Sequence, residues 1–181
     1  MTANMTFRDF LDHAEKFLDE AQSAPQSLAE TAVVRHYCAS LVFSWIALDA
    51  FVNDMMSDFA ALPEDLFSLH ERAFLEERAV EFVVEGSDLG QFSLSGRRQF
   101  HRIDEKIMFL IAKFGKGTTI DKGSAWWQKF ETSKDKRNKI VHPRKGESVD
   151  IAVQDARDAL DVARDVIRVV SRSVWDKEVE Q

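Results

Sequence analysis

The chain has 181 residues, of which 45% are apolar and 30% are charged, and its formal net charge is −7. This composition is typical of a globular protein, argues against intrinsic disorder, and at this length favours one domain over two. Cys38 is the single cysteine, which excludes an intrachain disulfide. The segment after Met1 lacks the apolar core of a signal peptide, and the longest apolar run, Leu41 to Val52, is shorter than the ~20 residues that span a bilayer. We therefore expect a cytoplasmic protein.

Apolar residues recur with helical spacing through the first half of the chain. Phe7 to Ala21 follows the spacing of an amphipathic helix, which Pro25 should end. A long second helix is expected from about Leu28 to Phe59, apolar on nearly all sides and therefore central and buried. Pro63 should begin a third helix that continues to Gly86.

The second half predicts three more helices. Two glycine-containing segments, Gly86–Gly96 and Gly115–Gly123, flank a fourth helix, and Ser124 can cap a fifth that ends near Val141. The last helix carries an apolar heptad seam of Val149, Val153, Ala156, Leu160, Ala163, Ile167, Val170 and Val174. No convincing strand pattern remains. We predict an all-α fold: a single domain over residues 1–181, built as an up-and-down bundle of about five to six helices with a long C-terminal heptad helix.

The acidic net charge counts against nucleic-acid binding, but the charge is unevenly distributed. Seven basic residues lie in the segment from Lys129 to Lys145, against the two acids Glu131 and Asp135. The basic residues are Lys129, Lys134, Lys136, Arg137, Lys139, Arg144 and Lys145. This segment is either a basic binding surface or simply a solvated charged face.

The motif from Arg137 to His142 lies in this basic segment and is followed by Pro143. Helical spacing places Arg137 on the inward side of the fifth helix, where a charge needs a partner or a function. Pro143 disfavours helical backbone at His142, so the helix should end near Val141 and the imidazole should turn back over its last turn. A permanent cation, an amide and an imidazole can together hold a phosphate and transfer a proton without a metal. The alternative is that both side chains only cap the last carbonyls.

Two polar residues on the otherwise apolar second helix are candidate partners for this motif. Asp49 and Asn53 are four residues apart and therefore point to the same side. Because buried polar groups are almost always paired, the economical arrangement sets Asp49 and Asn53 against Arg137, Asn138 and His142. The alternative is that both face solvent at an exposed end of the helix. A di-iron site is excluded, because no histidine has a glutamate three residues before it.

Arg137-Asn138 followed by three residues and His142 resembles the Arg-polar-x3-His signature of HEPN domains (higher eukaryotes and prokaryotes nucleotide-binding). The stretch Ala47–Asn53 is similar to the acidic-aromatic-Asn helix common among bacterial members. The resemblance covers roughly the second, fifth and sixth predicted helices. It implies metal-independent RNA cleavage, in many members by a homodimeric toxin or phage-defence effector that has an antitoxin or another regulatory partner.

The resemblance also implies roles for individual residues. His142 would act as general acid or base, Arg137 would stabilise charge on the scissile phosphate, and Asn138 would position either group. Asp49 and Asn53 would support the site, and no metal or cofactor would be needed. A phosphate track would be supplied by Lys134, Lys136, Lys139, Arg144 and Lys145.

Two other interpretations stay open. The chain could be a noncatalytic helical dimerisation or adaptor protein in which Arg137 and His142 are structural. It could also be a ligand-binding bundle that uses Trp126 and Trp127 as a stacking wall. Adjacent residues on a helix point to different faces, so at least one of these two tryptophans is expected in the core.

Overall fold

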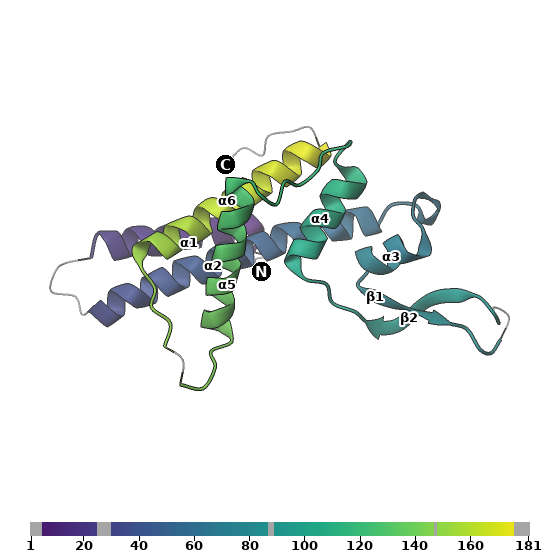
Figure 1. Ribbon diagram of the computed structural model, residues 1–181, viewed down its shortest axis with the longest axis horizontal. Helices are drawn as coiled ribbons and strands as arrows, with labels where there is room; N and C mark the ends of the chain where they lie inside the picture. The colour runs from purple at the N-terminus through teal and green to yellow at the C-terminus, as the bar shows by residue number, and fades with distance from the viewer. Residues whose placement is uncertain (1–4, 25–29, 87–88, 147, 176–181) are drawn as a thin grey trace. The chain divides into compact units, whose positions relative to one another are not determined.

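The computed structural model describes residues 5–24, 30–86, 89–146 and 148–175, and within these ranges the chain is mostly helical (Figure 1). The described helices are α1 (Phe7–Gln22), α2 (Glu30–Ala60), α3 (Leu69–Leu75), α4 (Ile103–Phe114), α5 (Ala125–Val141) and α6 (Val153–Trp175). A 3-10 turn (Glu64–Leu66) and two strands, β1 (Arg78–Phe82) and β2 (Phe92–Arg98), complete the described elements. The predicted all-α class is confirmed, with a small two-stranded sheet as an addition.

The contacts within the chain divide it into two compact units. One comprises Met1–Phe51 and Ile111–Gln181, and the other comprises Val52–Leu110. The boundaries fall inside α2 and inside α4, so each of these helices contributes residues to both units. Leu28 and Pro25, at which we expected one helix to begin and another to end, lie outside the described residues.

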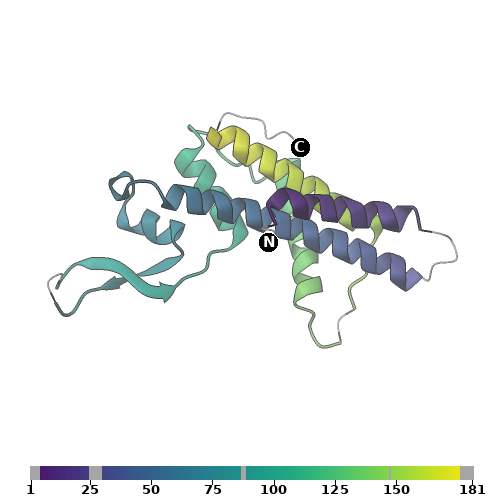
Figure 2. The ribbon, with the colours of Figure 1, turned by 180° about the vertical axis from the view of Figure 1, so that it is seen from behind.

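In the first unit, α1 runs antiparallel to α2 and is held to it by aromatic contacts (Figure 2). The ring of Phe7 lies 5.3 Å from that of Phe51, whereas Phe17 lies 5.9 Å from His36 near the other end of the pair. A capping box begins α1, because the Thr6 hydroxyl accepts from the Asp9 amide and the Asp9 carboxylate accepts from the Thr6 amide at 2.6 Å.

The predicted apolar seam of the last helix is confirmed as the buried face of α6. Its buried members are Ala156, Leu160, Ala163, Ile167, Val170 and Val174. Ala156 and Leu160 pack against Ala14 and Leu18 of α1, and α6 also lies against α5. Val149 precedes the helix and does not belong to it.

The predicted third helix is wrong over most of its length. A capping box of Ser68 and Glu71 begins α3, which ends after seven residues at Leu75. Glu77 then adopts a left-handed backbone conformation with φ of 49°, which a helix does not contain. The chain continues as the antiparallel hairpin of β1 and β2, against which α3 packs.

The hairpin was not predicted because its strands are short and bury few apolar side chains. Val80 faces Leu94 and Phe82 faces Phe92 across the two strands. Phe82 and Phe92 stay more than half exposed and contact each other edge to face at 5.4 Å. The buried residues of the two strands are Ala79 and Ser95, one small and one polar, so the strands lack the alternation of large apolar and polar residues that marks a half-buried sheet.

Among the described residues, α2 is the one helix that is long and apolar enough to cross a membrane, judged by length and composition. Central helices of soluble proteins meet the same criterion. Here Leu41, Trp45 and Leu48 of α2 are buried within the first unit.

Candidate functional site

The α5 helix is positioned against α2 by a buried contact between two aromatic rings and a hydrogen bond. The rings of Trp45 and Phe130 lie 5.4 Å apart, and Trp45 Nε1 donates to Ser133 Oγ at 3.0 Å. All three residues are buried. One helical turn further along each helix stand Asp49 on α2 and Arg137 on α5, so the packing of the aromatic pair determines where the charged pair meets.

Arg137 lies at the edge of this contact, with 29% of its side chain exposed. Its Nη2 is 3.7 Å from Asp49 Oδ2, and its Nη1 donates to Asn138 Oδ1 at 3.2 Å. The guanidinium is therefore oriented from two sides while further N–H groups stay available for a ligand. Asp49 is 41% exposed, so the ion pair is in contact with solvent.

His142 lies at the end of α5, as expected because Pro143 disfavours a helical backbone at the residue before it. Its φ of −126° and ψ of 61° leave the helical region, and its backbone N–H donates to the Asn138 carbonyl at 2.9 Å. The side chain is exposed and lines a hollow of about 320 Å³ together with Asn138, Lys139 and Arg144. An imidazole at this place is open to a ligand and has two cations beside it.

Arg137 does not line this hollow of Asn138, Lys139, His142 and Arg144. Its guanidinium lies beside Asp49 of α2, whereas His142 follows the last residue of α5 with a non-helical backbone. Asn138 is common to both, because its amide contacts Arg137 and its side chain lines the hollow with His142.

The five predicted phosphate-binding cations fall into two groups. Lys134 is bound to Glu131 at 2.7 Å, and Lys136 is bound to Asp155 of α6 at 3.0 Å. Lys139, Arg144 and Lys145 are exposed, and among the described residues they form no ion pair. The latter three are therefore open to a ligand.

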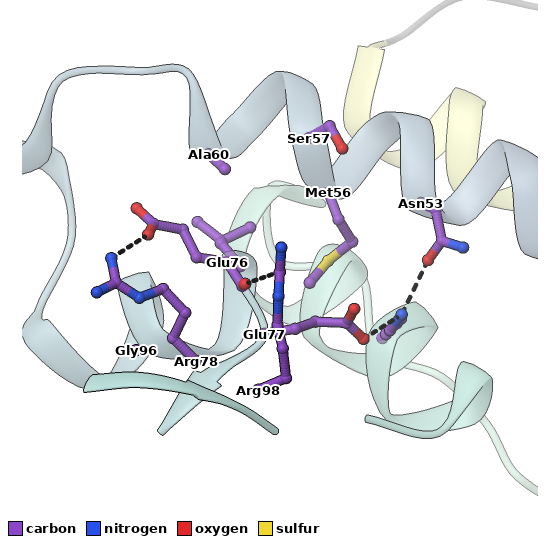
Figure 3. Close-up of a pocket in the computed structure, with 11 residues that line it drawn as sticks. Asn53, Met56, Ser57, Ala60, Glu76, Glu77, Arg78, Gly96 and Arg98 are labelled. Carbon is purple, nitrogen blue, oxygen red and sulfur yellow. Dashed lines mark hydrogen bonds and ion pairs between the residues drawn. The ribbon is translucent and has the colours of Figure 1, made fainter. Parts of the chain in front are cut away.

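Asn53 has a different partner from the predicted one. Its Oδ1 accepts from Lys106 Nζ of α4 at 2.8 Å (Figure 3). The reason is that Lys106 is 8% exposed and its buried ammonium needs acceptors, which Asn53 and Glu77 provide. The prediction missed Lys106, although its position between Ile103 and Leu110 on the apolar stripe of α4 marks it as an inward-facing charge.

Trp126 and Trp127 form no stacking wall. Their rings meet edge to face at 5.4 Å and 85°, and Trp127 is 3% exposed and packs on Phe130. Trp127 is a core residue, as the adjacent positions of the two tryptophans predict for at least one of them.

The chain was compared with family models, with curated proteins and with solved structures. None of them matches it. Its function is therefore argued from its own residues.

Proposed function

We propose that this chain is a metal-independent endoribonuclease of the HEPN type that acts in the cytoplasm, for example as a toxin or phage-defence effector. The observation that carries the proposal is the exposed His142, which shares a hollow with Lys139 and Arg144 and lies one residue beyond the helix that holds Arg137. Asp49 orients Arg137 without enclosing it. These are the groups that cleavage of RNA requires.

The proposed reaction uses the ribose 2′-OH as an internal nucleophile. The 2′-oxygen attacks the adjacent phosphorus, the bond to the 5′-oxygen breaks, and the products are a 2′,3′-cyclic phosphate and a 5′-hydroxyl. The 2′-OH loses a proton and the leaving 5′-oxygen gains one; His142 carries out one of these transfers and water the other, and Arg137 stabilises the charge that develops on the phosphate. Lys139, Arg144 and Lys145 bind neighbouring phosphates of the RNA.

A homodimer is part of this proposal. Arg137 is paired with Asp49 and does not line the hollow of His142, so one phosphate is reached by both types of group most simply when two copies of the chain contribute to it. The resemblance to HEPN domains points in the same direction. A regulatory partner, such as an antitoxin, would then act by covering the exposed cations after α5.

The test is RNA cleavage in the presence of EDTA by the wild type and by matched variants. His142→Ala should lower the rate roughly 10²–10⁴-fold and Arg137→Ala roughly 10²–10³-fold. The controls are His70→Ala on α3 and Arg157→Ala on α6, which remove an exposed histidine and an exposed arginine elsewhere and should cleave like wild type. A substrate with 2′-deoxyribose at the cleavage position should stay intact. Equal activity of all four variants, or cleavage of the deoxy substrate, would exclude this mechanism.

A noncatalytic dimerisation or adaptor role is the second candidate. The observation that favours it is that Arg137 already has two partners within the chain, Asp49 and Asn138. In that case Arg137→Ala should lower the thermal stability or dissociate a dimer, and the wild type should leave RNA intact.

A further inference from the structure

A second hollow, of about 520 Å³, lies wholly within the unit Val52–Leu110 (Figure 3). Its walls come from the last turns of α2, the α3–β1 turn, the hairpin and the start of α4. It shares no residue with the α5 site and does not depend on the proposed ribonuclease activity. Its volume is in the range of small-molecule sites, roughly 300–1,000 Å³.

One wall is a buried charged network centred on Lys106. The ammonium contacts Glu77 Oε1 at 2.5 Å and Asn53 Oδ1 at 2.8 Å, and 10% of the Lys106 side chain is exposed. Burial raises the pKa of Glu77, but the hydrogen bond and the charge of Lys106 lower it more, so the pKa lies below its ordinary value of 4.5. Glu77 is thus ionised at neutral pH and compensates Lys106.

Glu77 reaches Lys106 from a strained backbone. A φ of 49° is rare for a residue other than glycine, and such strain tends to occur at functional sites. The conformation comes directly before the bulge in β1, between Arg78 and Val80, where the hairpin register shifts. The backbone is therefore strained at Glu77, the residue whose carboxylate lines the hollow beside Lys106.

Arg98 is the cation of the hollow that has no carboxylate partner. Its side chain extends from β2 towards α2, between Glu76 and Met56, as Figure 3 shows. Among the described residues it makes one hydrogen bond, from Nη1 to the Glu76 carbonyl at 3.1 Å. Arg78, by contrast, donates from each of its three nitrogens: Nη1 to the Glu76 carboxylate, Nη2 to the Leu94 carbonyl and Nε to the Ser95 carbonyl.

The rest of the lining limits what kind of ligand can enter. Three cations and two carboxylates line the hollow, so its formal charge is +1: Arg78, Arg98 and Lys106 against Glu76 and Glu77. Met56 and Leu75 contribute apolar side chains to the lining, and Ser57 of α2 contributes a hydroxyl. A monoanion neutralises this charge, whereas a dianion such as a phosphate monoester leaves an excess negative charge beside Glu77.

We propose that this hollow binds a small organic carboxylate, which Arg98 holds through its unoccupied guanidinium N–H groups while the apolar part of the ligand lies over Met56 and Leu75. Arginine suits this role because its planar fork matches the two oxygens of a carboxylate. Lys106 and Glu77 keep the wall of the site in place, and the Ser57 hydroxyl can bond to a polar substituent of the ligand.

The experiment is a titration of the full chain with phenylacetate, with its uncharged analogue phenylacetamide and with inorganic phosphate, followed by NMR chemical shifts and by calorimetry. Phenylacetate should bind saturably and shift resonances of Met56, Leu75 and Arg98, and phenylacetamide should bind about tenfold more weakly or not at all. Arg98→Gln should weaken phenylacetate binding about tenfold or more. Arg97→Gln should leave it unchanged, because Arg97 is the exposed neighbour whose side chain points to the opposite face of β2.

Four results would overturn the proposal. The first three are the absence of saturable phenylacetate binding, equal binding of phenylacetate and phenylacetamide, and an equal loss of binding in Arg97→Gln and Arg98→Gln. Tighter binding of phosphate than of phenylacetate would assign the hollow to phosphate chemistry and would also contradict the carboxylate assignment. Far-UV circular dichroism of both variants verifies that each is folded.

Discussion

The contact between α2 and α5 contains a buried hydrogen bond and a solvent-exposed ion pair, and their contributions to stability can be measured separately. Trp45 and Ser133 are 3% and 5% exposed, so Ser133→Ala leaves a buried indole N–H without its acceptor. This should cost about 1–3 kcal/mol of the free energy of unfolding. Asp49 and Arg137 are separated by 3.7 Å but are in contact with water, and exposed ion pairs of this kind contribute about 0.2–1 kcal/mol.

The assay is urea unfolding followed by far-UV circular dichroism for two double-mutant cycles. One cycle combines Asp49→Asn with Arg137→Gln, and the other combines Trp45→Phe with Ser133→Ala. We expect a coupling energy of about 0.5 kcal/mol in the first cycle and about 1 kcal/mol or more in the second. In a chain of this length, each 1 kcal/mol corresponds to a shift in Tm of roughly 2–4 °C.

A coupling above about 2 kcal/mol between Asp49 and Arg137 would refute this reasoning, because it exceeds the range of solvent-exposed pairs. Arg137 would then be a structural residue, and any loss of RNA cleavage in its variants would reflect loss of folding. A neutral Ser133→Ala would equally contradict the role assigned to the buried hydrogen bond. If both cycles behave as expected, Arg137→Gln gives a folded protein in which the effect on catalysis can be measured separately.

Two further predictions concern titratable groups. The pKa of Glu77 is lowered in the folded chain, so its contribution to stability is present above pH 4.5, the ordinary value, and is lost as the pH falls through the lower folded value. Glu77→Gln should remove this part of the acid dependence in unfolding curves measured between pH 3 and 7. At neutral pH the same variant should lower the free energy of unfolding by about 1–3 kcal/mol. Unchanged acid dependence in Glu77→Gln would show that other carboxyl groups are responsible. Burial raises the pKa of Cys38 above its ordinary value of 9.0, so iodoacetamide should modify the native chain more slowly at pH 8 than the urea-unfolded chain, as measured by intact mass; equal rates would contradict this.

The features that the sequence predicted correctly are those decided by local rules. The heptad seam places α6 because its spacing repeats over six turns, and Pro143 places the end of α5 because it restricts the residue before it. The pairing of Arg137 with Asp49 follows from the rule that a charge on an inward stripe needs a counter-charge within reach.

The features that could not be predicted depend on tertiary contacts. The predicted pairing of Asn53 with α5 rests on its position one helical turn from Asp49, whereas its hydrogen-bond donor is Lys106, more than fifty residues further along the chain. The hairpin could not be predicted because its buried residues, Ala79 and Ser95, are small or polar, so neither strand shows an alternation of large apolar and polar residues. The ion pair of Lys136 with Asp155 of α6 likewise depends on a tertiary contact that the sequence does not reveal.

The position of the unit boundaries in the chain has a consequence for biosynthesis. Residues 52–110 form a contiguous unit, whereas the other unit needs Ala14 and Leu18 to meet Ala156 and Leu160. On the ribosome, the contiguous unit can fold first, whereas the apolar face of α1 stays uncovered until α6 has been synthesised. At 5–20 residues per second, the interval between the addition of residue 110 and the completion of α6 lasts roughly 3–13 s. During this interval Phe10 and Phe17 of α1 can already stack on Phe43 of α2, which covers part of α1 before α6 is complete.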